Sequence, residues 1–116
     1  MTDCIFCKIA KGEIPSAKAY EDDLVYAFHD IHPLRPTHIL VIPKEHIASL
    51  AETSAADEPV LGRLLSVAHR LAAENGSPEG FRAIINTGRI GGQEVPHLHL
   101  HIVGGETPVG PMLNKI

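Results

Sequence analysis

Near the C-terminal end of the chain, three histidines alternate with aliphatic residues. The segment reads His97-Leu98-His99-Leu100-His101-Ile102. Successive side chains of a β-strand point to opposite faces, so this alternation predicts a strand with all three imidazoles on one face. The aliphatic face is then free to join a hydrophobic core. Because imidazole acts as base, nucleophile, cation or metal ligand near neutral pH, the histidine face predicts a chemical site.

Apolar periodicity elsewhere predicts one main helix among short strands. Leu and Ala at helical spacing predict a helix over residues 57–75, with Asp57 as N-cap and Gly76 in the left-handed position after it. An apolar run predicts a strand at 37–43. The other expected elements are a short helix at 4–10, a helical turn at 46–50, a glycine-rich loop at 88–92, and strands at 19–20, 24–28, 81–87 and 97–103.

Together these elements predict an α+β fold: an antiparallel sheet of about five strands, one long helix and a short N-terminal helix. With 116 residues, the chain is expected to form a single domain, 1–116, ending in an irregular tail at 104–116. The aliphatic side chains expected under the long helix are Ile39, Val41, Ile84, Leu98 and Leu100.

Charge and the N-terminal sequence argue against several classes of partner. Ten Lys and Arg against fourteen Asp and Glu leave a net charge of −4, whereas nucleic-acid binding normally requires a basic surface. The first 20 residues hold charges and no long apolar run, which predicts a cytoplasmic protein without signal peptide or membrane span. In that setting Cys4 and Cys7, spaced C-x-x-C, favour a metal site or a redox pair over a structural disulfide.

The glycine-rich loop precedes the three histidines directly. Gly91-Gly92 permits unusual backbone angles, and free consecutive N–H groups there would form an anion-binding nest. A nest beside imidazoles is suited to phosphate. Since a neutral imidazole is a good nucleophile when a carbonyl or carboxylate orients its second nitrogen, the pair predicts phosphoryl or nucleotidyl transfer.

Residues 97–103 resemble the signature of the histidine triad (HIT) superfamily. Supporting segments span most of the chain in the family's order: 4–9, 28–31, 36–44, Asn86 and 91–93. The chain is most similar to the histidine triad nucleotide-binding proteins of bacterial type. The resemblance implies a homodimer whose two sheets join into one. It also implies hydrolysis of purine nucleoside phosphoramidates or acyl-nucleotidylates to a nucleoside monophosphate.

The resemblance also implies a role for each matching residue. His99 would attack the α-phosphorus to form a nucleotidyl-histidine, and the carbonyl of His97 would orient it. His101 would contact phosphate oxygen, and His38 would complete a proton relay to the leaving group. The implied nucleotide contacts are Asp30 at the ribose, Phe28, His29 and Ile31 beside the base, and Asn86, Gly92, Gln93, Glu94 and Val95 near the phosphate or leaving group.

Two positions depart from the animal members of this branch. Glu94 replaces a serine whose hydroxyl assists the phosphate site. An ionised carboxylate cannot donate and would repel phosphate, so we expect it to turn outward and to offer only its backbone N–H. The tail at 104–116 lacks the tryptophan that those members place near the partner's site, which changes the expected leaving-group preference.

A closed tetrahedral zinc site needs two ligands besides the C-x-x-C thiolates. His46 and His97 are the candidates, and some bacterial members of the superfamily hold structural zinc with two Cys and two His in these places. The alternative is a pair of reduced cysteines. No cofactor is expected for catalysis itself.

Other functions remain open from the sequence. One is a metal hydrolase with His97, His99 and His101 as zinc ligands, although side chains at i, i+2 and i+4 of a strand diverge too far for all three to reach one ion. Another is a dinucleoside-polyphosphate hydrolase of a sister branch. A third is a nucleotide-binding protein with low turnover.

Overall fold

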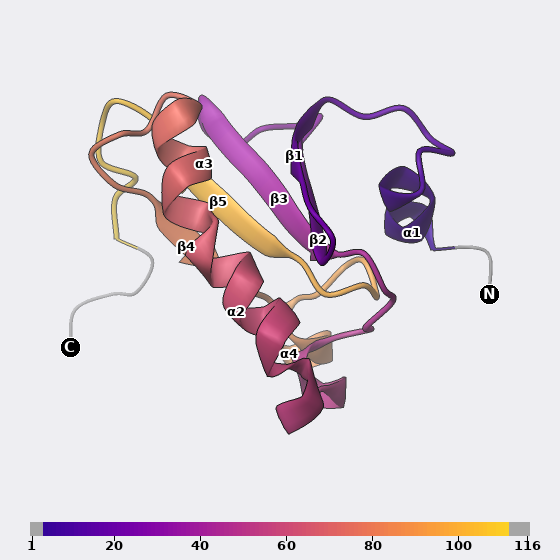
Figure 1. Cartoon of the computed structure of the whole chain (residues 1–116). Helices are drawn as coiled ribbons and strands as arrows, with labels where there is room; N and C mark the ends of the chain where they lie inside the picture. The colour runs from indigo at the N-terminus through magenta and orange to yellow at the C-terminus, as the bar shows by residue number, and fades with distance from the viewer. Residues whose placement is uncertain (1–3, 112–116) are drawn as a thin grey trace.

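Five short antiparallel strands form one sheet in the computed structural model, which describes residues 4–111 (Figure 1). Their order across the sheet is β1-β2-β3-β5-β4. The central strand β3 is entirely buried, as the apolar run predicts. The strands are β1 (Lys18–Glu21), β2 (Val25–His29), β3 (Thr37–Pro43), β4 (Arg82–Ile84) and β5 (Leu100–Gly104).

The expected main helix is present with one interruption, at Val67. Asp57 precedes it, but its carboxylate accepts from the N–H of Ser54 and closes a capping box on the preceding 3-10 turn. Gly76 has φ +101°, which confirms the left-handed end. The helical elements are α1 (Ile5–Ala10), η1 (Leu50–Glu52), η2 (Ala55–Asp57), α2 (Glu58–Ser66), α3 (Ala68–Glu74) and α4 (Gly88–Gly91).

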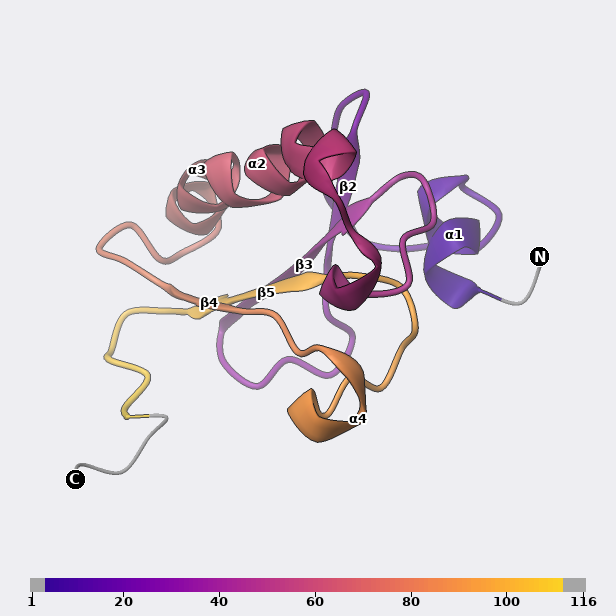
Figure 2. The same ribbon diagram turned by 90° about the horizontal axis from the view of Figure 1, so that it is seen from below.

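The two faces of the sheet carry different side chains. Helices α2 and α3 cover one face, and α4 lies on the other side of the strands (Figure 2). The alternation of β5 is confirmed, because Leu98, Leu100 and Ile102 belong to the core under the helices. The opposite face carries a second apolar cluster, with Phe6 and Phe28 among its members. The histidines lie on this second face.

Several expectations differ from the structure, and one is the strand expected at 81–87, which forms only over Arg82–Ile84 as β4. Strand β5 begins only at Leu100, because the N–H of Leu98 donates to Ile47 O at 2.7 Å instead of to β3. Ile84 is opposite His101 in the β4–β5 register, so it lies on the histidine face and not under the helix. The helical turn expected at 46–50 instead starts at Leu50, as η1. Within the described residues, no helix is long and apolar enough to cross a membrane.

Candidate active site and metal site

Sheet register brings the candidate catalytic histidines together. Leu40 of β3 is opposite both Phe28 of β2 and His101 of β5, so these three form one row across the sheet. His38 lies two positions before Leu40 and therefore on the same face. The rings of His99 and His101 lie 5.0 Å apart between centroids, and those of His38 and His101 lie 5.2 Å apart.

His99 is held with one ring nitrogen free. Its Nδ1 lies 2.8 Å from the carbonyl oxygen of His97, so Nδ1 carries the proton and donates it. The Nε2 lone pair is therefore available. The ring is buried, and Phe6 of α1 packs edge-on against it with centroids 5.2 Å apart. A neutral imidazole fixed in this tautomer is oriented for nucleophilic attack.

A chain of hydrogen bonds also fixes the tautomers of His38 and His101. The backbone N–H of Leu34 donates to Nδ1 of His38 at 3.0 Å, so His38 carries its proton on Nε2. That Nε2–H donates to Nδ1 of His101 at 3.0 Å. His101 therefore carries its own proton on Nε2. One backbone amide in the β2–β3 loop thus determines that His38 and His101 both carry their proton on Nε2, so that each ring donates from that nitrogen.

Burial keeps these two rings neutral. Desolvation, together with the neighbouring His99 and His38, lowers the pKa of His101 to about 4, against a smaller opposing effect of Asp30. Desolvation also lowers the pKa of His38, again opposed by Asp30. Both rings are consequently uncharged hydrogen-bond donors at pH 7.

Asp30 lies at the end of β2 beside this pair, with Oδ2 3.6 Å from Nε2 of His38. Its Oδ1 accepts from the N–H of His32 at 2.8 Å. Asp30, His38 and His101 have ligand atoms within 4.8 Å of one another, as a cation site would. However, Nε2 of His38 already carries a proton directed into the cluster. The group is therefore arranged as a hydrogen-bonded chain.

The residues expected beside the base lie at the end of β2. Phe28 is buried, with its ring 5.6 Å from that of Phe6. His29 and Asp30 are half-buried, and Ile31 is 83% exposed. Phe28 therefore belongs to the apolar cluster with Phe6, whereas Ile31 extends into solvent.

The expected anion nest at Gly91-Gly92 is wrong. Residues 88–91 form the single helical turn α4, and the amides of Gly91 and Gly92 themselves are already bonded within it. Asn86 contacts this turn, since a Cβ on Gly91 would lie 3.6 Å from its carbonyl carbon. The internal hydrogen bonds are Gly91 N–H to Thr87 O at 3.1 Å, Gly92 N–H to Arg89 O at 3.2 Å and Gln93 N–H to Gly88 O at 3.0 Å.

The segment after α4 leads into the histidines. The side chain of Gln93 donates to Ala48 O at 2.7 Å and to Val95 O at 2.9 Å, and these two bonds fix the position of the segment. Val95 packs against the cluster of Phe6 and Phe28. Glu94 is exposed, in agreement with the expected outward carboxylate.

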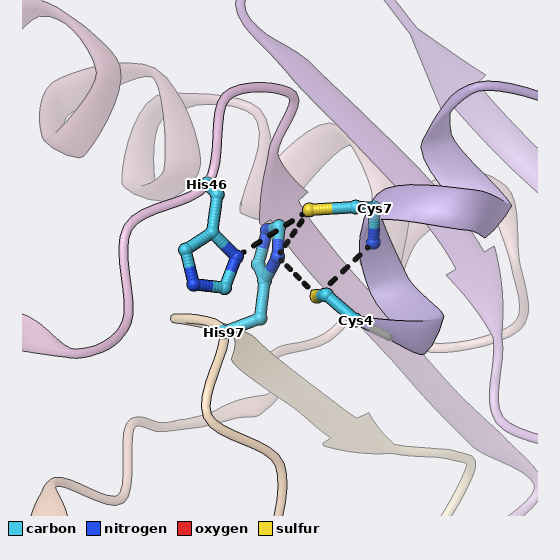
Figure 3. A group of neighbouring side chains, drawn as sticks. All are labelled: Cys4, Cys7, His46 and His97. Carbon is cyan, nitrogen blue, oxygen red and sulfur yellow. Dashed lines mark hydrogen bonds between the residues drawn. The ribbon is translucent and has the colours of Figure 1, made fainter. Parts of the chain in front are cut away.

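A second group of side chains meets at the N-terminal helix (Figure 3). Cys4, Cys7, His46 and His97 place their sulfur and nitrogen atoms within 4.8 Å of one another. Nδ1 of His97 lies 3.2 Å from Sγ of Cys4 and 3.6 Å from Sγ of Cys7, and Nδ1 of His46 lies 3.4 Å from Sγ of Cys7. Tetrahedral zinc with two thiolates and two imidazoles separates its ligand atoms by roughly 3.3–3.8 Å. The donor set and spacing fit zinc.

His97 is already oriented for this role. Its Nε2–H donates to the carbonyl oxygen of Pro43 at 2.9 Å, which leaves the Nδ1 lone pair directed at the thiols. Such a carbonyl partner is typical of metal-ligating histidines. The alternative catalytic metal site at His97, His99 and His101 is wrong. Nδ1 of His97 faces the cysteines, while Nδ1 of His99 donates to a carbonyl, so the three rings do not share one centre.

Three contributors to the site were missed from the sequence. Phe6 packs on His99, the N–H of Leu34 orients His38, and the carbonyl of Pro43 orients His97. The latter two act through the backbone, so residue type gives no signal for them. Phe6 lies two positions after Cys4, and only its distance from the histidines in sequence concealed it.

The HIT domain matches residues 11–107 of the chain. The chain belongs to the histidine triad (HIT) family. Over 112 residues, this HIT protein is 52% identical to a purine nucleoside phosphoramidase of Escherichia coli (strain K12), and the match covers 96% of this chain and 93% of that protein. With such a relative along nearly its whole length, this HIT protein is an enzyme.

Solved structures agree with the fold of this HIT protein. A histidine triad protein from Clostridium difficile superimposes with TM-score 0.89 at 48% identity, covering 96% of this chain and 97% of that one. A Zn-bound histidine triad family protein from Mycobacterium smegmatis gives TM-score 0.79 at 32% identity, covering 92% and 78%. The α+β architecture predicted from the sequence is thus confirmed.

Proposed function

We propose that this HIT protein hydrolyses purine nucleoside phosphoramidates and acyl-nucleotidylates through a covalent nucleotidyl-histidine. The observation that carries the proposal is the hydrogen bond from Nδ1 of His99 to the carbonyl of His97, at 2.8 Å. It leaves the Nε2 lone pair of His99 free, on a ring whose centroid lies 5.0 Å from that of His101. A nucleophile and a donor for phosphate oxygen thus lie on one face.

The first step breaks the P–N bond of the substrate. Nε2 of His99 attacks the α-phosphorus, and the bonding electrons leave with the amine nitrogen. The His38–His101 pair takes up one proton with the substrate, since a nearby phosphate favours its charged form, and gives it to the leaving nitrogen. Asp30, 3.6 Å from His38, supports the added charge.

The second step regenerates the enzyme. Water attacks the phosphorus of the nucleotidyl-histidine, and the bond from phosphorus to Nε2 of His99 breaks. The His38–His101 pair takes the proton from the attacking water and releases it to solvent as the product leaves, which returns both rings to their neutral state. The products are a nucleoside monophosphate and neutral His99, which the carbonyl of His97 holds in its starting tautomer.

Nucleotide binding is assigned to the open edge of the same face. The base lies against Phe28 and between His29 and Ile31, and Asp30 binds the ribose hydroxyls. His101, Asn86 and the amides of Glu94 and Val95, which have no backbone acceptor within residues 4–111, are assigned to the phosphate and leaving group. Gly92 and Gln93 contribute shape only, because their amides are bonded within the α4 segment.

We also propose structural zinc at Cys4, Cys7, His46 and His97. Zinc there links α1 to the start of the histidine segment and to the loop after β3, and it supplies stability but no catalytic step. The sulfur–nitrogen separations of 3.2, 3.4 and 3.6 Å support it. Zinc content of the purified protein, compared with a Cys4→Ser/Cys7→Ser variant, tests it. Equal values near zero would exclude the site.

The domain is proposed to act as a homodimer, with the tail at 104–116 near the interface. Sheet order leaves β1 and β4 as edge strands. β4 is adjacent to β5, which carries His101, so pairing of two β4 strands would join the sheets beside both sites. Residues 112–116 of the tail lie outside the described residues. Sedimentation equilibrium measures the mass directly, and a monomer at micromolar concentration would contradict the dimer.

Trapping the intermediate tests the central proposal. The protein is mixed with an adenosine phosphoramidate, quenched in acid, and analysed by mass spectrometry. We expect an adenylyl group on His99, its absence in His99→Ala, and its presence in His69→Ala, which changes an exposed helix histidine.

Other outcomes would reject the nucleophile or indicate a different function. Label on another residue, or full turnover by His99→Ala, would reject the nucleophile. Faster cleavage of a dinucleoside polyphosphate would indicate the sister activity. Tight AMP binding without turnover would indicate a binding protein.

A further inference from the structure

The amide that orients His38 lies in a loop with little anchorage of its own. Residues 31–36 connect β2 to β3, and the Leu34 side chain is 75% exposed although its N–H bonds His38. A hydrogen bond from such a loop fixes a tautomer only if the loop is held in place. The loop at 31–36 therefore needs a contact with another segment of the chain.

The tail after β5 holds it. Antiparallel pairing sets Thr37 opposite Gly104, so the chain entering β3 and the chain leaving β5 run side by side. Arg35 Nη2 donates to Thr107 O at 3.0 Å, to Thr107 Oγ1 at 2.9 Å and to Pro108 O at 3.4 Å. Within residues 4–111, these are the side-chain hydrogen bonds that join the loop to the tail.

Packing completes the contact. Gly105 has φ +149°, and a Cβ there would lie 3.4 Å from Cδ of Pro36, so the tail runs directly against the loop. Nε of Arg35 is buried, with no acceptor among the described residues. The Nε edge of the guanidinium is thus covered, while Nη2 bonds the tail at the surface and Arg35 as a whole is half-buried.

We propose that Arg35 is a positioning residue: by clamping the loop to Thr107 and Pro108, it keeps the N–H of Leu34 on Nδ1 of His38 and so keeps the His38–His101 pair in its donating tautomers. The expected effect on catalysis rests on the proposed function, whereas the expected effect on the His38 tautomer does not. Arg35 does not touch substrate in this scheme.

The test compares variants that remove the clamp with one that does not. Arg35→Met removes the guanidinium, Thr107→Val removes one acceptor, and Arg35→Lys restores a charged donor. Arg70→Met is the matched control, since Arg70 stacks on Tyr20, 4.7 Å from the ring centroid. Long-range ¹H–¹⁵N correlation NMR shows which nitrogen of His38 is protonated, and steady-state kinetics with an adenosine phosphoramidate give kcat and KM.

In Arg35→Met we expect a mixture of His38 tautomers and a kcat lowered roughly fivefold to tenfold, the effect of losing about one hydrogen bond, with KM within about twofold. Thr107→Val should show a smaller change of the same kind, and Arg35→Lys partial recovery. Arg70→Met should match the wild type. Thr107→Val also serves as the informative variant if Arg35→Met fails to fold.

A single unchanged His38 tautomer in folded Arg35→Met or Thr107→Val would overturn the inference. Equal kinetic loss in Arg70→Met would overturn it as well. A shifted tautomer in Arg35→Met, together with a wild type that does not cleave phosphoramidates, would reject the proposed function while supporting the clamp.

Discussion

His99 donates its Nδ1–H to the carbonyl oxygen of His97, while the ring of the same His97 lies 3.2 Å from the sulfur of Cys4. One residue therefore belongs to both sites. Its backbone orients the nucleophile, and its side chain joins the group of sulfur and nitrogen atoms. A shift of the His97 backbone would therefore displace both the ring that faces the cysteines and the carbonyl that fixes the tautomer of His99.

This link predicts that changes at the cysteines reach the active site. We expect Cys4→Ser/Cys7→Ser to lose bound zinc, to lower the melting temperature, and to lower kcat although neither residue faces the nucleotide. The matched control is Ser16→Ala, which changes a distant hydroxyl bonded to Tyr26. Unaltered kcat in a double variant shown to be metal-free would separate the two sites.

The low pKa of His101 predicts a stability that depends on pH. Its ring titrates near pH 4 in the folded chain, against an ordinary value of 6.5. Between these values the unfolded chain binds a proton that the folded chain does not, so the free energy of unfolding falls as the pH falls from 6.5 towards 4. Above the ordinary value both states are neutral and the contribution vanishes.

Denaturant unfolding of the wild type and His101→Gln at about pH 7.5, 6 and 5 measures this dependence. We expect a steeper loss in the wild type, because the variant lacks the titrating ring. The metal site is the same in both proteins, so its own pH dependence cancels. Parallel curves would show that His101 titrates alike in the folded and unfolded chains.

The aliphatic face of β5 predicts a large packing effect. Leu100 is 1% exposed and lies in the core under the helices. Leu100→Ala should lower the free energy of unfolding by about 2–5 kcal/mol. Leu65→Ala, on the solvent side of α2 at 57% exposure, should change it by no more than about 0.5 kcal/mol. A similar loss in both variants would contradict the assignment of the two faces.

Replacing each of two glycines by alanine should change the stability of the fold in opposite directions. A Cβ on Gly104 would lie 2.1 Å from Oγ of Ser77, so Gly104→Ala should destabilise the fold by about 1–3 kcal/mol. Gly62 lies inside α2, and a Cβ there would meet nothing within 4 Å, so Gly62→Ala should stabilise the fold by about 0.5–1 kcal/mol. Thermal unfolding of both variants checks the pair, and a stabilising Gly104→Ala would contradict the close contact.

Much of the fold was predictable from local pattern. Strand β3 occupies the expected residues 37–43, because a continuous apolar run leaves few alternatives for a chain segment of that length. The alternation at the C-terminus correctly divides Leu100 and Ile102 from His99 and His101. Face assignments follow from strand geometry, which depends on neighbouring residues alone.

Other features depended on backbone hydrogen bonds that residue type does not indicate, either within a short segment or to a distant residue. Gly91-Gly92 looked like an open nest, but the amides of that segment bond within α4. The start of β5 moved to Leu100 because the Leu98 amide pairs with Ile47. No local rule identifies Ile47 as that acceptor.

The sequence by itself determined which chemical groups are present and which face of a strand they share, since both follow from residue type and the period of the backbone. Only the tertiary structure decided the protonated nitrogens of His38 and His97, whereas the family resemblance already implied the carbonyl of His97 as the partner of His99. The choice at His38 and His97 depends on an amide or carbonyl of another residue: Leu34 N–H for His38 and Pro43 O for His97. Backbone groups are the same in every residue, so their use in the three-histidine face is set by folding and not by composition.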